Sequence, residues 1–198
     1  MKVLVIGAGN MGLTYAEAMS KSKLLKKRNL MILDSSPEKI LSLKKILHFD
    51  VFENLEDCLP KADLIFLAVK PYHSEELFAK IKTLANPGQI VISIMAGVTI
   101  GTMQESMGIP KVVRAMPNLP AQIGKGVTSY TASKEVSRIE LLTIENLLDT
   151  TGKSIHVSSE KFIDASTGIS GSGPAYVFYF MQSMMEAALK MGFSANDS

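Results

Sequence analysis

The sequence has little of several features that would place it in a specialised class. Its 198 residues include one cysteine, Cys58, which excludes an internal disulfide and is compatible with a reducing cytoplasm. The three histidines, His48, His73 and His156, are too scattered to supply the ligand spacing of a metal site. No apolar run approaches the roughly 18 residues of a membrane span, and no secretion signal precedes the first apolar segment. We therefore expect a cytoplasmic protein without a metal centre and without a membrane partner.

An excess of charge of one sign is also missing. Lysine and arginine total 21, aspartate and glutamate total 19, and the formal net charge is +2. The densest basic run, Lys26-Lys27-Arg28, is typical of a solvated loop, so the chain lacks the electrostatic footprint of a nucleic-acid-binding protein. What is present is a hydrophobic content of 46%, which supports an ordinary packed core.

Apolar, strand-like segments alternate with helical ones through the first half of the chain. The run from Lys2 to Ile6 is short, rich in β-formers and followed by glycine, as expected of a buried parallel strand. Further strands are predicted at 30–33, 49–52, 63–69, 89–94 and 111–115, and helices at 11–21, from 36 onward, at 74–84 and at 99–107. This alternation predicts an α/β fold with a mostly parallel sheet and helices on both faces.

The second half extends this sheet and then becomes helical. Strands are predicted at 127–131 and 153–157, with a helix at 134–148 between them. From Glu160 the pattern is helical, and the segment from Ala175 to Met191 is apolar almost all round, which predicts a buried helix. We expect a first domain over 1–158 and the beginning of an all-α domain over 159–198. A further helical region or another subunit is expected to cover the last helix.

A glycine-rich turn follows the first strand and opens the first helix. Its three glycines have the spacing of a dinucleotide-binding loop of the Rossmann type: Gly7 permits the tight turn, Gly9 lets a pyrophosphate approach, and Gly12 lets the helix pack on the strand. The helix N-terminus adds free N–H groups and a positive dipole end for the phosphates. The first domain is therefore predicted to bind a nicotinamide dinucleotide, with the whole turn in contact: Gly7, Ala8, Gly9, Asn10, Met11 and Gly12.

The end of the second strand carries the residues expected to contact the adenosine ribose. Asp34 lies 22 residues after Gly12, close to the roughly 20 expected of the acid that binds the ribose hydroxyls. Its charge favours NADH, whereas the hydroxyls of Ser35 and Ser36 and the cation of Lys39 suit the 2′-phosphate of NADPH. A role for Asp34 as a helix N-cap is the structural alternative, and the cofactor stays open between NADPH and NADH.

Three later segments also combine features of ligand sites with simpler structural explanations. The segment Ala68-Val69-Lys70-Pro71 ends a buried strand, where open α/β sheets bind ligands. Lys70 could contact an anionic substrate or a phosphate there, and the sequence is equally compatible with a solvated surface lysine. The small residues after the strand at 89–94 let backbone approach a flat ring. In the Gly168–Tyr176 segment, Ser172 is predicted to cap the final helix, and Pro174 suits that helix's first turn, whereas the functional alternative is that its free N–H groups face an anion.

Five motifs, taken together and in this order, resemble those of the Δ1-pyrroline-5-carboxylate reductases. They are Ile6-Gly7-Ala8-Gly9-Asn10-Met11-Gly12, Phe66-Leu67-Ala68-Val69-Lys70-Pro71, Ser93-Ile94-Met95-Ala96-Gly97-Val98, Arg114-Ala115-Met116-Pro117-Asn118 and Gly168-Ile169-Ser170-Gly171-Ser172-Gly173-Pro174-Ala175-Tyr176. The resemblance runs through the whole chain, and its last motif is the most specific. It implies reduction of the cyclic imine pyrroline-5-carboxylate to L-proline with NADPH or NADH, in a homodimer or larger homo-oligomer.

The resemblance also implies site residues. Cofactor contacts are implied for the glycine turn, for Ser35 and Ser36, and for these further positions: Asn54, Ala68, Val69, Lys70, Pro71, Met95, Ala96 and Gly97. Substrate contacts are implied for Asn118, Glu160 and Ser172. The protonated imine is already electrophilic, so orientation by the protein matters more than a strong protein acid, and no catalytic residue is assigned.

The sequence departs from the family pattern in one respect. The serine-proline-glycine-glycine-threonine type loop that binds the substrate carboxylate, in the family's C-terminal helical domain, does not occur in these 198 residues. The sequence therefore does not establish that these 198 residues alone are catalytically active. The alternatives are another dehydrogenase of the imine-reducing or β-hydroxyacid kind, and a non-catalytic module that binds NAD(P).

Overall fold

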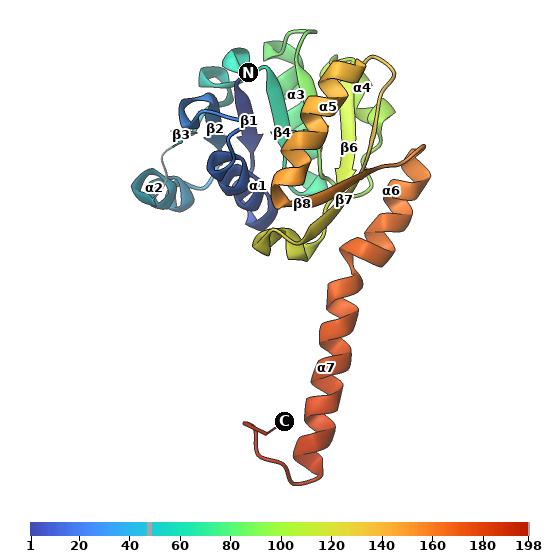
Figure 1. Ribbon diagram of the computed structural model, residues 1–198. Coiled ribbons are helices and arrows are strands. Elements are labelled where there is room, and N and C mark those ends of the chain that lie inside the picture. Colours follow the sequence, from blue (N-terminus) through green and yellow to red (C-terminus); the bar gives the residue numbers. More distant parts are fainter. Residues whose placement is uncertain (47–48, 198) are drawn as a thin grey trace.

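The structure is a computed structural model that describes residues 1–46 and 49–197 (Figure 1). His48, one of the scattered histidines, lies outside the described residues. The described strands are β1 (Val3–Ile6), β2 (Leu30–Leu33), β3 (Asp50–Phe52), β4 (Leu64–Leu67), β5 (Ile90–Ser93), β6 (Lys111–Met116), β7 (Gly126–Ala132) and β8 (Gly152–His156). The longer helices are α1 (Asn10–Lys21), α2 (Pro37–Ile46), α3 (Ser74–Leu84), α4 (Ile100–Met107), α5 (Arg138–Leu148), α6 (Glu160–Ser166) and α7 (Gly173–Lys190).

The strands form one sheet in the order β3-β2-β1-β4-β5-β6-β7-β8. Strands β1 to β6 pair in parallel, β7 runs antiparallel to β6, and β8 runs parallel to β7. The order changes direction at β1, whose neighbours are β2 and β4. Ligands of open α/β sheets bind outside the carboxyl ends of strands at such a switch point. The predicted mostly parallel sheet is confirmed, and the antiparallel step at β7 is a detail that the sequence did not indicate.

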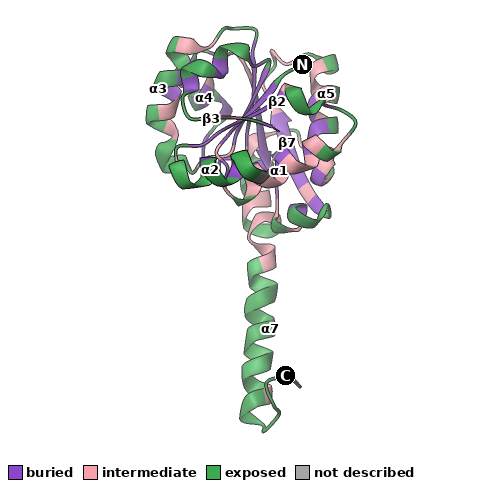
Figure 2. Ribbon diagram, turned by 90° about the vertical axis from the view of Figure 1, so that its left-hand side faces the viewer, coloured by how far each residue is buried: buried purple, intermediate pink, exposed green. Residues whose placement is uncertain are grey.

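Helices cover both faces of the sheet, as predicted. Successive strand residues point to opposite faces, so Val3 and Val5 pack with α1, α2 and α5, whereas Leu4 and Ile6 pack with α3 and α4. Figure 2 shows the buried residues concentrated in the strands and on the inner sides of these helices. Cys58 is fully buried in the α3/α4 layer, where it acts as a packing residue between two short turns, η2 (Leu55–Asp57) and η3 (Leu59–Lys61).

The helix predicted at 134–148 begins later than expected, at Arg138. Ser137 caps it: its hydroxyl accepts the N–H of Glu140, and the Glu140 carboxylate accepts the N–H of Ser137. A capping box satisfies two N–H groups that would otherwise lack partners, so it fixes the helix start. Lys134 and Glu135 therefore lie in the preceding turn, which corrects the predicted boundary.

Glu140 also joins α5 to the sheet through an ion pair with Lys111 at 2.6 Å. Lys111 and the backbone of Ser137 lower the pKa of Glu140 to about 2, from an ordinary value of 4.5. The ionised carboxylate thus stabilises the fold above pH 4.5, and this stabilisation is lost as the pH falls towards 2. We expect Glu140→Gln to lower the free energy of unfolding by about 1 kcal/mol at pH 7 and by less at pH 3. Urea unfolding at both pH values checks this, and an equal difference at both would contradict it.

The final helix, α7, projects away from the sheet domain (Figures 1 and 2). Its large apolar side chains are exposed in the single chain, with Phe180 at 66%, as expected of an apolar helix whose cover is not among the described residues. At 100° per residue, its polar side chains Gln182, Ser183, Glu186 and Lys190 fall on one stripe, and apolar side chains occupy the rest of its circumference. Such a surface needs a cover that lies outside the described chain. Among the described residues, no helix combines the length and apolar character required to cross a membrane.

Candidate functional site

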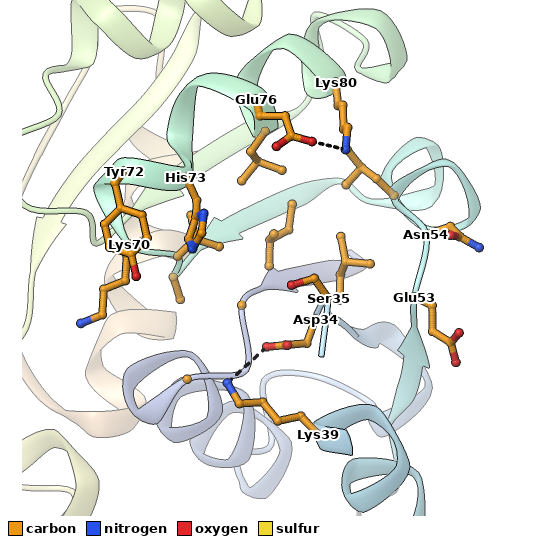
Figure 3. A pocket seen from close by; sticks show the side chains of 18 of the residues that line it. Asp34, Ser35, Lys39, Glu53, Asn54, Lys70, Tyr72, His73, Glu76 and Lys80 are labelled. Carbon is orange, nitrogen blue, oxygen red and sulfur yellow. Dashed lines mark hydrogen bonds and ion pairs between the residues drawn. The ribbon is translucent and has the colours of Figure 1, made fainter. Parts of the chain in front are cut away.

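A cleft of about 610 Å³ opens at the carboxyl ends of β1, β2 and β4, at the switch point of the sheet. Side chains from the β1–α1 and β2–α2 connections face it from one side. The short turn η4 (Pro71–His73) and the start of α3 face it from the other, and residues after β3 close one end (Figure 3). The lining residues are Ile6, Gly7, Gly9, Leu33, Asp34, Ser35, Lys39, Glu53, Asn54, Leu55, Glu56, Ala68, Val69, Lys70, Tyr72, His73, Glu76, Leu77 and Lys80.

The three glycines of the turn are required for different steric reasons. Gly7 has a positive φ of 99°, and a Cβ on it would lie 2.9 Å from the carbonyl oxygen of Ala68. A Cβ on Gly12 would lie 1.9 Å from the carbonyl oxygen of Gly7, so only glycine lets α1 approach the strand. At Gly9, by contrast, no described atom lies within 4 Å of the Cβ position. Gly9 lines the cleft, so the space beside it is open to a ligand. The geometry fits the pyrophosphate of a dinucleotide at the N-terminus of α1.

Asp34 braces the glycine turn. Its carboxylate accepts the N–H of Ala8 at 2.7 Å and the N–H of Ser36 at 2.9 Å. The Nζ of Lys39 lies 3.9 Å from the carboxylate, which is only 9% exposed. Both carboxylate oxygens of Asp34 therefore accept a backbone N–H, and the neighbouring Lys39 partly neutralises the negative charge. Asp34 still lines the cleft, so a carboxylate and a cation stand side by side where an adenosine ribose would lie.

Ser36, not Asp34, provides the cap of α2. The Lys39 N–H donates to the Ser36 Oγ at 3.4 Å, and Pro37 occupies the first helical position, where its fixed φ suits the helix. This cap turns the first residues of α2 toward the cleft, so Ser35 and Lys39 line it. Figure 3 shows Lys39 reaching back over the cleft toward Asp34.

The cleft brings together part of the predicted cofactor set. The predicted residues that line it are Gly7, Gly9, Asp34, Ser35, Asn54, Ala68, Val69 and Lys70. Others lie next to the cleft in the sequence without lining it: Ala8 and Ser36 in the connections, Asn10, Met11 and Gly12 in the first turn of α1, and Pro71 at the start of η4. Met95, Ala96 and Gly97 follow β5 and are outside the cleft, because Met95 turns into the core of the α3/α4 layer. Their predicted cofactor contact stays a prediction.

The three residues with implied substrate contacts lie away from the cleft, along the junction between the sheet and α6. Asn118 accepts the N–H of Val127 at 2.9 Å and donates to the Ser170 Oγ at 3.1 Å. Glu160 forms an ion pair with Arg114, described below. Ser172 does not cap α7, which corrects the prediction: its hydroxyl donates to the Thr167 carbonyl at 3.0 Å and makes no capping bond in the described structure. The reason is a π-helical turn, η7 (Thr167–Gly171), which makes α6 and α7 nearly continuous.

Several cleft residues were not predicted from the sequence, and four of them carry polar or aromatic side chains on one side of the cleft. They are Tyr72, His73, Glu76 and Lys80, on η4 and α3. The available signal was positional: a helix that begins just after a buried strand places its first turns over the same edge of the sheet. Glu76 and Lys80 form an i,i+4 ion pair at 2.8 Å on that overhanging side, which leaves Lys39 and Lys70 as the cations nearer the glycine turn (Figure 3). In the described part of the chain, no cluster of His, Cys, Asp and Glu is arranged to hold a metal ion.

Comparison with known proteins gives the site its context. A family model described as NADP oxidoreductase coenzyme F420-dependent matches residues 2–97, and one described as pyrroline-5-carboxylate reductase dimerisation matches residues 160–198. The pyrroline-5-carboxylate reductase of Aquifex aeolicus is 35% identical over 195 residues, which cover 98% of this chain and 71% of the relative. The chain belongs to the pyrroline-5-carboxylate reductase family. The pyrroline-5-carboxylate reductase of Escherichia coli is 33% identical over 192 residues, which cover 96% of this chain and 71% of that relative.

A solved structure extends the family likeness to three dimensions. The crystal structure of Plasmodium falciparum pyrroline carboxylate reductase with NADP bound matches with a TM-score of 0.86 and 30% identity. The match covers 99% of this chain and 72% of that one, so it includes the sheet domain and the projecting helix. The resemblance and the fold class inferred from the sequence are thereby confirmed.

Proposed function

We propose that this chain reduces pyrroline-5-carboxylate to L-proline with NADPH as the preferred reductant. Family membership over nearly the full chain carries the proposal. The cleft at the switch point supports it, because it joins the glycine turn, Asp34 and the end of β4 in one place. When bound, the cofactor supplies the hydride, and the protein holds it and the imine in register.

The glycine turn and the start of α1 would hold the pyrophosphate, and the end of β2 would hold the adenosine ribose. Gly9 leaves room for the phosphates, and the first-turn N–H groups of α1 point at them. The Ala8 N–H is already donated to Asp34, which keeps the turn in its binding shape without a ligand. Preorganisation of this kind lowers the entropy that binding must overcome.

The preference for NADPH rests on the environment of Asp34. A free carboxylate at this position would repel a 2′-phosphate, but two backbone N–H groups and Lys39 surround this one. The hydroxyl of Ser35 and the ammonium of Lys39 line the same wall and suit a phosphate. The charge of Asp34 taken alone favours NADH, whereas its contacts with two N–H groups and Lys39 support the proposed preference for NADPH. The NADP bound in the Plasmodium falciparum structure also supports this proposal.

Two substitutions separate these roles. We expect Lys39→Ala to lower kcat/KM for NADPH by about tenfold and to leave kcat/KM for NADH within about twofold, because the 2′-phosphate loses a charged partner. Asp34→Ala is expected to weaken both cofactors together, because it releases the N–H groups of Ala8 and Ser36. Steady-state oxidation of both cofactors with pyrroline-5-carboxylate measures each ratio.

Two results would count against these assignments. If Lys39→Ala lowered kcat/KM for both cofactors equally, the NADPH preference would need another source. If neither cofactor turned over with pyrroline-5-carboxylate despite tight binding, the reductase proposal itself would fail, and a non-catalytic module would be the better account.

We propose further that the chain works as a homodimer through α7. The match of residues 160–198 to the dimerisation model and the apolar circumference of α7 both support a second copy as the cover. In this proposal residues 1–158 form the dinucleotide-binding domain, and the helical part begins at 159. The cytoplasm is the proposed location, and the buried free thiol of Cys58 fits a reducing compartment.

A further inference from the structure

Arg114 is a buried charge that lies outside the cofactor cleft. Its side chain, on β6, is 1% exposed. Its Nη1 donates to the Glu160 carboxylate at 3.0 Å, and its Nη2 donates to the Asp164 carboxylate at 2.5 Å. Its Nε has no hydrogen-bond partner among the described residues. A guanidinium is tolerated inside a protein only when it is paired, so these two carboxylates determine whether the side chain can stay where it is.

Both carboxylates belong to α6, the first helix of the segment that matches the dimerisation model. One of them makes a further contact: the oxygen of Glu160 that faces Arg114 also accepts the N–H of Ile100 at 2.9 Å. Ile100 is the first residue of α4 and follows the 95–97 loop after Val98 and the N-cap residue Thr99. A single carboxylate oxygen therefore links α6 to strand β6 and to the start of α4.

The junction under α6 is unusually polar for a helix on a sheet. Arg114 lies opposite Thr131 in the β6–β7 register, and Met116 lies opposite Ser129, so these side chains share one face. On α6, Ser166 donates to the Ser129 hydroxyl at 2.9 Å. Apolar contact is not directional, whereas charged hydrogen bonds to a planar guanidinium are. The polar contacts of the junction therefore define the angle at which α6 leaves the sheet.

The same strand face continues past Arg114 along the chain. Met116 and Asn118 follow at two-residue spacing, and each meets η7: the Met116 sulfur lies 3.8 Å from the Cβ position of Gly171, and Asn118 donates to Ser170. Residues 114, 116 and 118 thus contact α6 and the π-helical turn in sequence order. Single π-helical turns within α-helices are frequent at functional sites.

We propose that Arg114 is a positioning residue that fixes α6 and η7 against the sheet through Glu160 and Asp164. Through the shared oxygen of Glu160 it also sets these helical elements relative to the 95–97 loop. Arg114 touches neither substrate nor cofactor in this account. Its effect on turnover rests on the proposed reductase function, whereas its effect on the placement of α6 does not.

The test compares Arg114→Met, which keeps the length of the side chain without its charge, with Arg114→Lys and with the exposed control Arg138→Met. Hydrogen exchange of the amides at 160–171 is expected to rise at least about tenfold in Arg114→Met, because two charged hydrogen bonds are lost. Exchange in β1 and β4 should stay unchanged. Arg114→Lys should restore part of the protection, since lysine keeps one ion pair but not the planar fork.

The kinetic readout separates positioning from stability. Well below the melting temperature, kcat/KM of Arg114→Met for pyrroline-5-carboxylate should fall about 10- to 100-fold, while KM for NADPH changes less than about twofold. This pattern is expected when α6 and η7 are displaced and the cofactor cleft is intact. Parental exchange at 160–171 in Arg114→Met would overturn the proposal. If the parent protein does not reduce pyrroline-5-carboxylate, the proposed function fails, and the exchange result still decides the role of Arg114.

A second variant covers the case in which Arg114→Met does not fold. The Asp164 side chain is 60% exposed, so in Asp164→Asn the neutral amide stays in contact with solvent while Arg114 loses one of its two charge partners. Faster exchange confined to α6 and η7, by about threefold, supports the proposal. Exchange identical to that of the parent throughout 160–171 contradicts it.

Discussion

Gly9→Ala is expected to weaken NADPH binding by about 10- to 100-fold while leaving the fold intact, because the added methyl group occupies the space reserved for the pyrophosphate. No described atom lies within 4 Å of the Cβ position of Gly9, so the protein itself accommodates the methyl group. Titration of NADPH fluorescence measures the dissociation constant, and thermal unfolding without cofactor measures stability. Unchanged NADPH affinity would place the pyrophosphate elsewhere.

Two other glycines serve as controls for this prediction. Gly101, near the start of α4, also has open space at its Cβ position but lies outside the cleft. Gly101→Ala should therefore leave NADPH binding unchanged and stabilise the fold slightly. Gly12→Ala, unlike Gly9→Ala, should lower the melting temperature, because its Cβ would collide with the backbone of Gly7. A loss of melting temperature in Gly12→Ala but not in Gly9→Ala separates packing of the turn from ligand contact.

The double substitution Phe180→Glu and Met184→Glu on α7 is expected to convert the proposed dimer to a monomer. The two residues lie one turn apart on the apolar side of the helix and are 66% and 59% exposed in the single chain. Burial of such a side chain contributes about 1.5–3 kcal/mol. Because a two-fold interface uses each position twice, the dimer loses roughly 6–12 kcal/mol, and its dissociation constant rises by at least about 10⁴-fold.

Light scattering after gel filtration measures the mass of the parent and of the variant. Ser183→Glu adds a charge on the polar stripe of the same helix and should leave the dimer intact. A parent that is monomeric at micromolar concentration, or a double variant that stays dimeric, would contradict the role assigned to α7.

Local features of the site could be predicted from the sequence. The glycine turn is set by six consecutive residues between a strand and a helix, so its spacing carries the whole signal. The cap at Ser36 and the position of Asp34 at the end of β2 are equally local. What the sequence could not indicate is the second acceptor role of Asp34 toward Ala8, since that bond joins residues 26 positions apart.

Features that depend on long-range contacts escaped prediction. Arg114 falls inside a segment correctly predicted as a strand, and a charge in the middle of a buried strand is itself a signal of a paired partner. Its partners lie 46 and 50 residues away on a helix whose docking the sequence does not specify. The antiparallel step at β7 likewise depends on how the 117–125 connection turns. For α7 the apolar pattern predicted the need for a cover, but a single chain cannot contain a cover that another molecule supplies.

The central claim is that this chain transfers a hydride from a nicotinamide cofactor to the carbon of a cyclic imine. The most direct measurement uses NADPH that carries deuterium at C4 of the nicotinamide, with each of the two diastereomers tested separately, and mass spectrometry of the product. The account predicts that one diastereomer yields proline one mass unit heavier, with the deuterium on the carbon that was double-bonded to nitrogen in pyrroline-5-carboxylate. Proline without deuterium from both diastereomers, or no proline from a protein that binds NADPH, would contradict it.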